Sequence, residues 1–105
     1  MNDLTSKRLD PKVRKEEILA VAVAHASVVG LNGLRRDDVA KQAGVANGLV
    51  SRYFNTMIQL RRAVLRSAVH NEILPLIAQG LAMREPEAMK ASDELKKKAL
   101  ATLSI

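Results

Sequence analysis

Helix-starting and helix-ending residues divide this chain into short segments, and this punctuation constrains its fold more than any other feature. Asp10 followed by Pro11 is a good helix start, because Asp caps the first turn and Pro fits the first helical position. No breaker follows before Gly30, and apolar residues recur there at helical spacing. We therefore predict a helix over residues 11–29.

Similar signals mark three further helices. A second predicted helix carries acidic residues 37–38 in its first turn, where they oppose the positive end of the helix dipole, and it stops at Gly44. A third short helix is expected over residues 47–54. Thr56 with Gln59 three residues later forms a capping box, so a fourth helix begins there.

The last third of the chain is also predicted to be helical. Pro75 should kink or end the fourth helix near Leu74. Residues 76–83 are apolar and predicted to be helical, and Pro86 can start one last helix that carries the C-terminal leucines. Neither a strand pattern nor an internal repeat is present, so the predicted fold class is all-α.

The positive charge is concentrated in the middle of the chain. The 105 residues, enough for one domain, carry a net charge of +6. Residues 1–34 hold five basic and four acidic side chains, residues 35–66 hold seven and two, and residues 67–105 hold five of each. Six of the seven central basic residues are arginine, which suits phosphate and base-edge contacts. A localised basic block favours a nucleic-acid partner; the alternative is a solvated, solubilising surface.

Composition argues against catalysis and against metal binding. The absence of cysteine excludes disulfides, cysteine-zinc sites and thiol nucleophiles. His25 fits a packed, neutral histidine on an apolar face, and His70 has no second ligand residue at metal spacing. No Ser-His-Asp set, glycine-rich phosphate loop or carboxylate pair stands in a plausible site. We expect no enzymatic activity, no metal and no cofactor.

An apolar run near the N-terminus imitates a secretory signal. Basic residues precede residues 18–29, but Glu16 and Glu17 stand directly before the run and His25 interrupts it. About a dozen residues are also too few to span a bilayer. We expect a cytoplasmic protein with no membrane partner.

Residues 36–54 have the spacing of a helix-turn-helix. Ala40 is small where a second helix crosses closely, Gly44 opens the turn, and Val50 follows six residues later on the inward face. In this motif the second helix enters the major groove of DNA while the first crosses the backbone. The alternative is a plain helical hairpin, since Ala, Gly and Val are common residues.

A wider set of residues follows the pattern of a known family. They are Ile18-Leu19, Val21-Ala22, Gly30, Val39-Ala40, Ala43-Gly44-Val45, Gly48, Tyr53-Phe54 and Leu60. With this set, residues 14–64 resemble the DNA-binding domain of Tet-repressor-type regulators. The resemblance implies a three-helix head and a fourth helix, which in that family links the head to a large helical effector and dimerisation domain. It also implies that residues near Arg36 and Met57 approach the DNA phosphates.

The same resemblance implies which residues face the operator: Asn47, Gly48, Leu49, Ser51, Arg52 and Tyr53. Arg52 is expected to read a guanine, with a phosphate contact as the alternative. Asn47 is expected to read adenine or contact phosphate, and the alternative is a local hydrogen bond at the helix start. Tyr53 is expected to contact phosphate through its hydroxyl, while Phe54 belongs to the core. Backbone contacts are expected from basic residues outside this helix: Arg35, Arg36 and Lys41.

The chain also departs from the family pattern. Ala46 stands where a serine usually caps the recognition helix, at a cost of about 1 kcal/mol. Ser51 and Met57 occupy positions where a tyrosine and a lysine usually contact phosphate. We expect nearby arginines to supply that charge: Arg35, Arg36, Arg61 and Arg62.

These patterns predict that the chain consists of two regions. Residues 10–55 form the predicted DNA-binding head, and residues 56–105 form a linking helix with a short helical dimerisation tail. The second half of the fourth helix and the last helices have more apolar surface than a three-helix head can bury, which predicts that they form a homodimer; the alternative is that the last helices fold back and stabilise a monomer. The length leaves no room for a large effector domain, so no small-molecule effector is expected.

The predicted function is sequence-specific regulation of transcription. We expect a repressor that binds double-stranded DNA, at a palindromic operator, as a homodimer. The alternatives are a non-specific DNA-coating or architectural protein and a helical adaptor for a protein partner.

Overall fold

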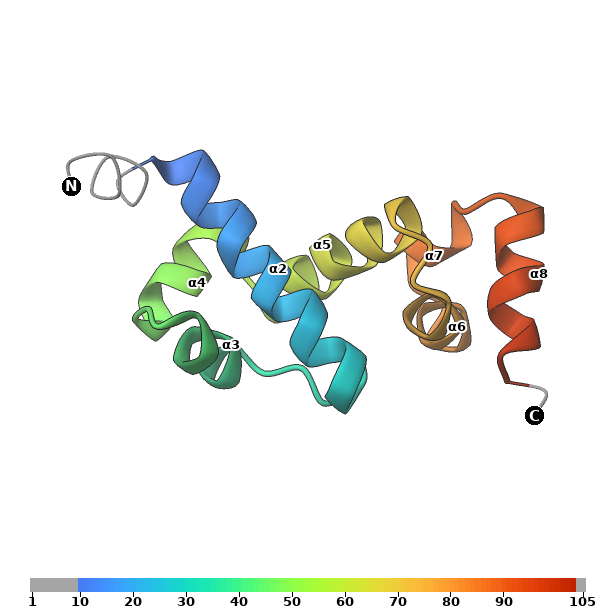
Figure 1. Ribbon diagram of the computed structural model, residues 1–105, viewed down its shortest axis with the longest axis horizontal. Coiled ribbons are helices and arrows are strands. Elements are labelled where there is room, and N and C mark those ends of the chain that lie inside the picture. Colours follow the sequence, from blue (N-terminus) through green and yellow to red (C-terminus); the bar gives the residue numbers. More distant parts are fainter. Residues whose placement is uncertain (1–9, 104–105) are drawn as a thin grey trace.

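Residues 10–103 are described by the computed structural model, and they form seven helices with no strand among them (Figure 1). The helices are α2 (Pro11–Val29), α3 (Arg36–Ala43), α4 (Asn47–Phe54), α5 (Met57–His70), α6 (Leu74–Ala82), α7 (Pro86–Met89) and α8 (Asp93–Ala101). The predicted all-α class is confirmed. None of these helices, within the described range, is both long and apolar enough to cross a membrane.

The predicted capping signals start α2 and α5. The Asp10 carboxylate accepts a hydrogen bond from the backbone N–H of Lys12 at 2.9 Å. The Thr56 hydroxyl accepts one from the backbone N–H of Gln59 at 3.2 Å. These bonds satisfy backbone donors that have no partner inside the helix. Local sequence therefore determines where both helices begin.

The predicted end of α5 was wrong by one turn. Pro75 does not end this helix near Leu74; α5 already ends at His70, and Pro75 occupies the second position of α6. The chain turns at Glu72, whose φ is +53°, and the N–H of Ile73 donates to the carbonyl of Ala68 at 2.8 Å. A left-handed residue at this position of a helix end is usually glycine. Here it is a glutamate, so no glycine marks the end of α5 in the sequence.

The prediction of one last helix from Pro86 is also wrong, because the structure has two helices in this region. The first is α7, which lasts only four residues, from Pro86 to Met89. Ser92 then starts α8, and its hydroxyl accepts from the N–H of Leu95 at 3.1 Å. Ser92 is thus a second N-cap, which the proline signal alone does not indicate.

One hydrophobic core runs through the molecule, and α5 is its centre. On one side α5 contacts α2 and α4, and on the other it contacts α6 and α7. Leu60, Val64, Leu65 and Ala68 of α5 are all fully buried. The second half of α5, which was expected to offer an apolar face for dimerisation, is thus covered by α6 and α7. Large exposed apolar side chains lie elsewhere: Val28, Val29, Ile58, Met89, Leu100 and Leu103.

The two ends of this elongated molecule, 49 × 23 × 22 Å in extent, are joined by more than α5 (Figure 1). The side-chain carbonyl of Gln79, on α6, accepts a hydrogen bond of 2.7 Å from the backbone N–H of Leu31. Leu31 follows Gly30, where φ is +85° and α2 ends. The bond ties α6 to the loop that connects α2 and α3.

Candidate nucleic-acid interface

The turn between α3 and α4 is built as the sequence predicted. Gly44 has φ +70°, and the N–H of Val45 donates to the carbonyl of Ala40 at 3.0 Å. Apart from its two chain neighbours, no atom lies within 4 Å of where a Cβ on Gly44 would be, so the backbone conformation, rather than lack of space, favours glycine here. Val39 and Val50 are fully buried and fix the two helices against each other.

Two side-chain hydrogen bonds brace α4 against the first turn of α3. The Arg36 guanidinium donates to the Ser51 hydroxyl at 2.7 Å, and its second contact, to the carbonyl of Asn55, is 3.5 Å long. The Asn47 amide donates to the Asp37 carboxylate at 2.6 Å. These two bonds reach α4 at its first residue and one turn later, so they hold its position along α3. Asn47 thus makes a side-chain contact at the helix start.

The bracing determines which part of α4 faces outward. Gly48 and Arg52 are exposed and stand one helical turn apart, whereas Asn47, also exposed, has its amide bonded to Asp37. Leu49 and Tyr53 pack against the core, and Ser51 is half-buried on the α3 side. Gly48 and Arg52 therefore form the open stripe of the recognition helix.

The remaining predicted contacts surround this helix. Arg35 and Lys41 are exposed at the start and in the last turn of α3. Arg35 and Arg36 also line a shallow hollow of about 290 Å³ together with Met57, the first residue of α5. The structure thus brings together the residues that the family resemblance places near the phosphates.

The basic block is partly neutralised by acidic residues that follow it in the sequence. The Arg62 Nε lies 3.9 Å from a carboxylate oxygen of Glu85, and the Arg66 guanidinium lies 3.3 Å from Glu87. Both arginines lie on α5, and both partners lie at α7. Arg62 thus has a long ion pair with the start of α7, while 37% of its side chain remains exposed. The expectation that Arg61 and Arg62 replace a missing phosphate contact stays a prediction.

The two histidines take no part in a metal cluster. His25 lies against α3, with its Nδ1 2.9 Å from the amide nitrogen of Gln42 and its Nε2 3.6 Å from the Asp38 carboxylate. Its side chain is only 10% exposed, which agrees with a packed histidine. Over residues 10–103 no three His, Asp, Glu or Cys side chains gather in a way that could hold a metal ion.

Sequence reasoning missed both braces. Their partners are separated by 15 and 10 residues, and no helical or turn periodicity links positions so far apart. The sequence assigns Asp37 only to the helix dipole, and Arg36 only to phosphate. The only hint in the sequence is that two adjacent predicted helices both carry polar residues that could face each other.

Comparison with known proteins shows which family this segment is similar to. Residues 18–64 match the family described as "Bacterial regulatory proteins, tetR family". The HTH-type transcriptional regulator BetI of Yersinia pestis (strain Pestoides F) is 27% identical over 78 residues, which cover 72% of this chain and 39% of the relative. BetI of Yersinia pseudotuberculosis serotype O:1b (strain IP 31758) matches to the same extent. No solved structure gives a significant match.

The matched segment and the geometry agree. It begins in α2, contains the complete helix-turn-helix and ends inside α5. The match covers about two fifths of the length of the curated relatives, and this part holds the turn at Gly44 and the open stripe of α4. The chain therefore carries an N-terminal helix-turn-helix DNA-binding domain of the tetR type.

Proposed function

We propose that this chain is a sequence-specific DNA-binding regulator of transcription that acts as a repressor. The observation that carries the proposal is the exposure of Gly48 in the first turn of α4: apart from its chain neighbours and the backbone of its own helix, no atom lies within 4 Å of where its Cβ would be. A glycine inside a helix costs about 1 kcal/mol relative to alanine, and the packing of this protein does not require one there. Close approach of the α4 backbone to a ligand does account for it.

Arg52 adds a second observation, because it stands one turn after Gly48 on the same exposed stripe. An α-helix fits the major groove of DNA, and an arginine there pairs with the O6 and N7 of guanine. In this arrangement Gly48 lets the helix approach, and Arg52 reads a base. Arg35 and Lys41 contact the phosphates on either side.

The test separates DNA binding from stability at Gly48. Gly48→Leu should leave the midpoint of urea unfolding unchanged or raise it, and should weaken binding to a selected DNA site at least about tenfold. Ala24→Leu, at an exposed position of α2, is the matched control and should bind as the parent does. Equal DNA affinity of the two variants would remove the main support for the proposal.

The same mobility-shift assay distinguishes the alternative functions. A specific regulator stays on its site when random competitor DNA is added, whereas a coating or architectural protein is competed away. A helical adaptor shows no shift at all. Arg52→Ala should cost about 1–3 kcal/mol of binding free energy at one base position.

We also propose that the regulator acts as a homodimer through α8 and the turn that follows it. Leu100 and Leu103 are 47% and 62% exposed, and Met89 nearby in sequence is 49% exposed. A two-fold dimer of helix-turn-helix heads reads half-sites about 34 Å apart, which predicts a palindromic operator. Occupancy of an operator that overlaps a promoter would repress transcription.

Sedimentation tests the dimer. Replacing Leu100 and Leu103 together with lysine should produce a monomer and should weaken binding to a palindrome more than binding to one half-site. Val28→Lys, at an apolar position that is 84% exposed on α2, is the control. A parent protein that is monomeric with and without DNA would contradict this part of the proposal.

A further inference from the structure

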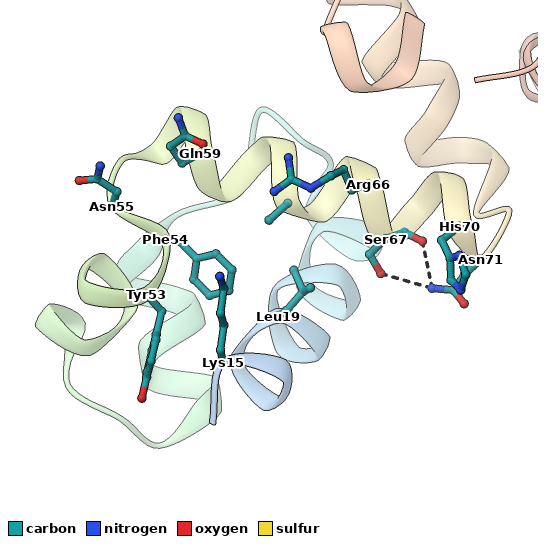
Figure 2. Close-up of a pocket in the computed structure, with 11 residues that line it drawn as sticks. Lys15, Leu19, Tyr53, Phe54, Asn55, Gln59, Arg66, Ser67, His70 and Asn71 are labelled. Carbon is teal, nitrogen blue, oxygen red and sulfur yellow. Dashed lines mark hydrogen bonds between the residues drawn. The ribbon is translucent and has the colours of Figure 1, made fainter. Parts of the chain in front are cut away.

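A cavity of about 550 Å³ opens where α2, the end of α4 and the outer face of α5 meet (Figure 2). Cavities of this size hold drug-sized molecules. Neither Gly48 nor Arg52 lines it, although Tyr53 and Phe54 at the end of α4 do. DNA binding through the open stripe of α4 therefore does not account for this cavity.

Part of its wall is apolar. Leu19 of α2, the Phe54 ring of α4 and Ala63 of α5 contribute carbon surface. Phe54 is 5% exposed and Ala63 6%, so these groups are anchored in the hydrophobic core and form a rigid wall. An apolar group that covers this wall would gain free energy in proportion to the area it removes from water.

The charged side chains of the lining all have the same sign. Lys15 and Arg66 reach in from α2 and α5, and none of the cavity-lining residues within the described chain is acidic (Figure 2). The Lys15 Nζ lies 5.5 Å from the centre of the Phe54 ring, which places a cation directly beside the apolar wall.

Arg66 is only partly neutralised. Its guanidinium lies 3.3 Å from the Glu87 carboxylate, but the same carboxylate also lies 3.6 Å from the Lys90 Nζ. One carboxylate shared by two cations leaves excess positive charge at this rim. Gln59 and Ser67 add polar groups that can donate hydrogen bonds.

We propose that this cavity is a binding site for an organic carboxylate with an apolar body of about ten carbon atoms. The carboxylate lies between Lys15 and Arg66, and the apolar body lies against Leu19 and Phe54. Arginine and lysine form charge-assisted hydrogen bonds with carboxylates, and the carbon surface between them excludes a small, fully hydrated anion as the best ligand. The proposal stands independently of DNA binding.

Isothermal titration with 2-naphthoate tests the site on the full chain. The carboxylate should bind at least about tenfold more tightly than 2-naphthalenemethanol, its neutral counterpart. The double variant Lys15→Gln/Arg66→Gln should lose this preference. The control Arg84→Gln/Lys97→Gln removes two cations outside the lining and should bind naphthoate as the parent does.

A third variant and a third probe keep the result interpretable. Ser67→Leu adds bulk inside the cavity without touching the cations, and it should weaken naphthoate binding while thermal unfolding shows an intact fold. Inorganic phosphate should not displace naphthoate at equal concentration. No binding up to about 5 mM naphthoate, equal affinity for the neutral alcohol, displacement by phosphate, or equal loss in the control variant would each overturn the proposal.

Discussion

Arg36 provides the sharpest test of how this domain positions its recognition helix. Sequence alone assigns Arg36 to a phosphate contact, whereas the structure places its guanidinium 2.7 Å from the Ser51 hydroxyl. We predict that Arg36→Ala acts mainly by loosening α4. The variant should lose stability as well as DNA affinity, and its DNA affinity should keep the parent's dependence on salt.

The size of the coupling free energy between Arg36 and Ser51 follows from their hydrogen bond and its exposure to water. A hydrogen bond to a charged donor contributes about 1.5–3 kcal/mol when solvent is excluded. The bond between Arg36 and Ser51 is only partly buried, so water competes and the expected coupling is about 1–2 kcal/mol. The second contact, 3.5 Å to the Asn55 carbonyl, is too long to add much. In a domain of this size, each kcal/mol lowers the melting temperature by about 4–8 °C.

A double-mutant cycle isolates this coupling. Urea unfolding of the parent, Arg36→Ala, Ser51→Ala and the double variant gives the interaction free energy between the two side chains. Arg35→Ala is the matched control, since Arg35 is exposed and its side chain forms no capping hydrogen bond to α3. That control should change stability by less than about 0.5 kcal/mol.

Salt titrations of DNA binding then distinguish bracing from phosphate contact. Loss of one phosphate contact reduces the slope of log affinity against log salt by about 0.9. We expect this reduction for Arg35→Ala and an unchanged slope for Arg36→Ala. A coupling free energy near zero together with a reduced slope for Arg36→Ala would refute the bracing role and restore the phosphate assignment.

Further predictions concern helix ends and packing. Glu72→Gly and Arg84→Gly should each raise the free energy of unfolding, measured in urea, by about 1 kcal/mol, because both residues have positive φ (53° and 56°); a lower free energy of unfolding for both would contradict the backbone explanation. Ala46→Ser should stabilise α4 by about 1 kcal/mol through an N-cap hydrogen bond that the structure lacks at this residue, and thermal unfolding measures it. Gly80→Ala should destabilise by about 1–3 kcal/mol, since its Cβ would lie 2.8 Å from side chains of α5 and α7; an unchanged melting temperature would mean that these helices separate easily.

The head of the molecule was the easier part to predict from sequence. Asp10, Gly44 and Thr56 act on backbone groups within a few residues of themselves, so their effect can be read locally. The Ala40–Gly44–Val50 spacing can also be recognised within one short segment, and it indicates where two helices cross. The helix-turn-helix spacing, together with the family resemblance, therefore sufficed to propose candidate DNA-binding residues on α4.

The tail was predicted less well because its helix ends lack the usual residues. Glu72 and Arg84 both turn the chain in a left-handed conformation that ordinarily indicates glycine. A glutamate gives no local sign of this conformation, so the end of α5 was missed. The break between α7 and α8 does have a local signal, the N-cap Ser92, which the prediction from Pro86 left out.

The sequence by itself determined the all-α class, the helix-turn-helix, the position of its turn and the stretch that carries the basic residues. These features depend on local backbone chemistry and on helical periodicity, which neighbouring residues set. Only the tertiary structure decided that Arg36 braces α4, that Arg62 and Arg66 face carboxylates, and that Lys15 lies beside Phe54 at a cavity. Each of these depends on distances between residues far apart in the chain, and those distances exist only once the helices have packed.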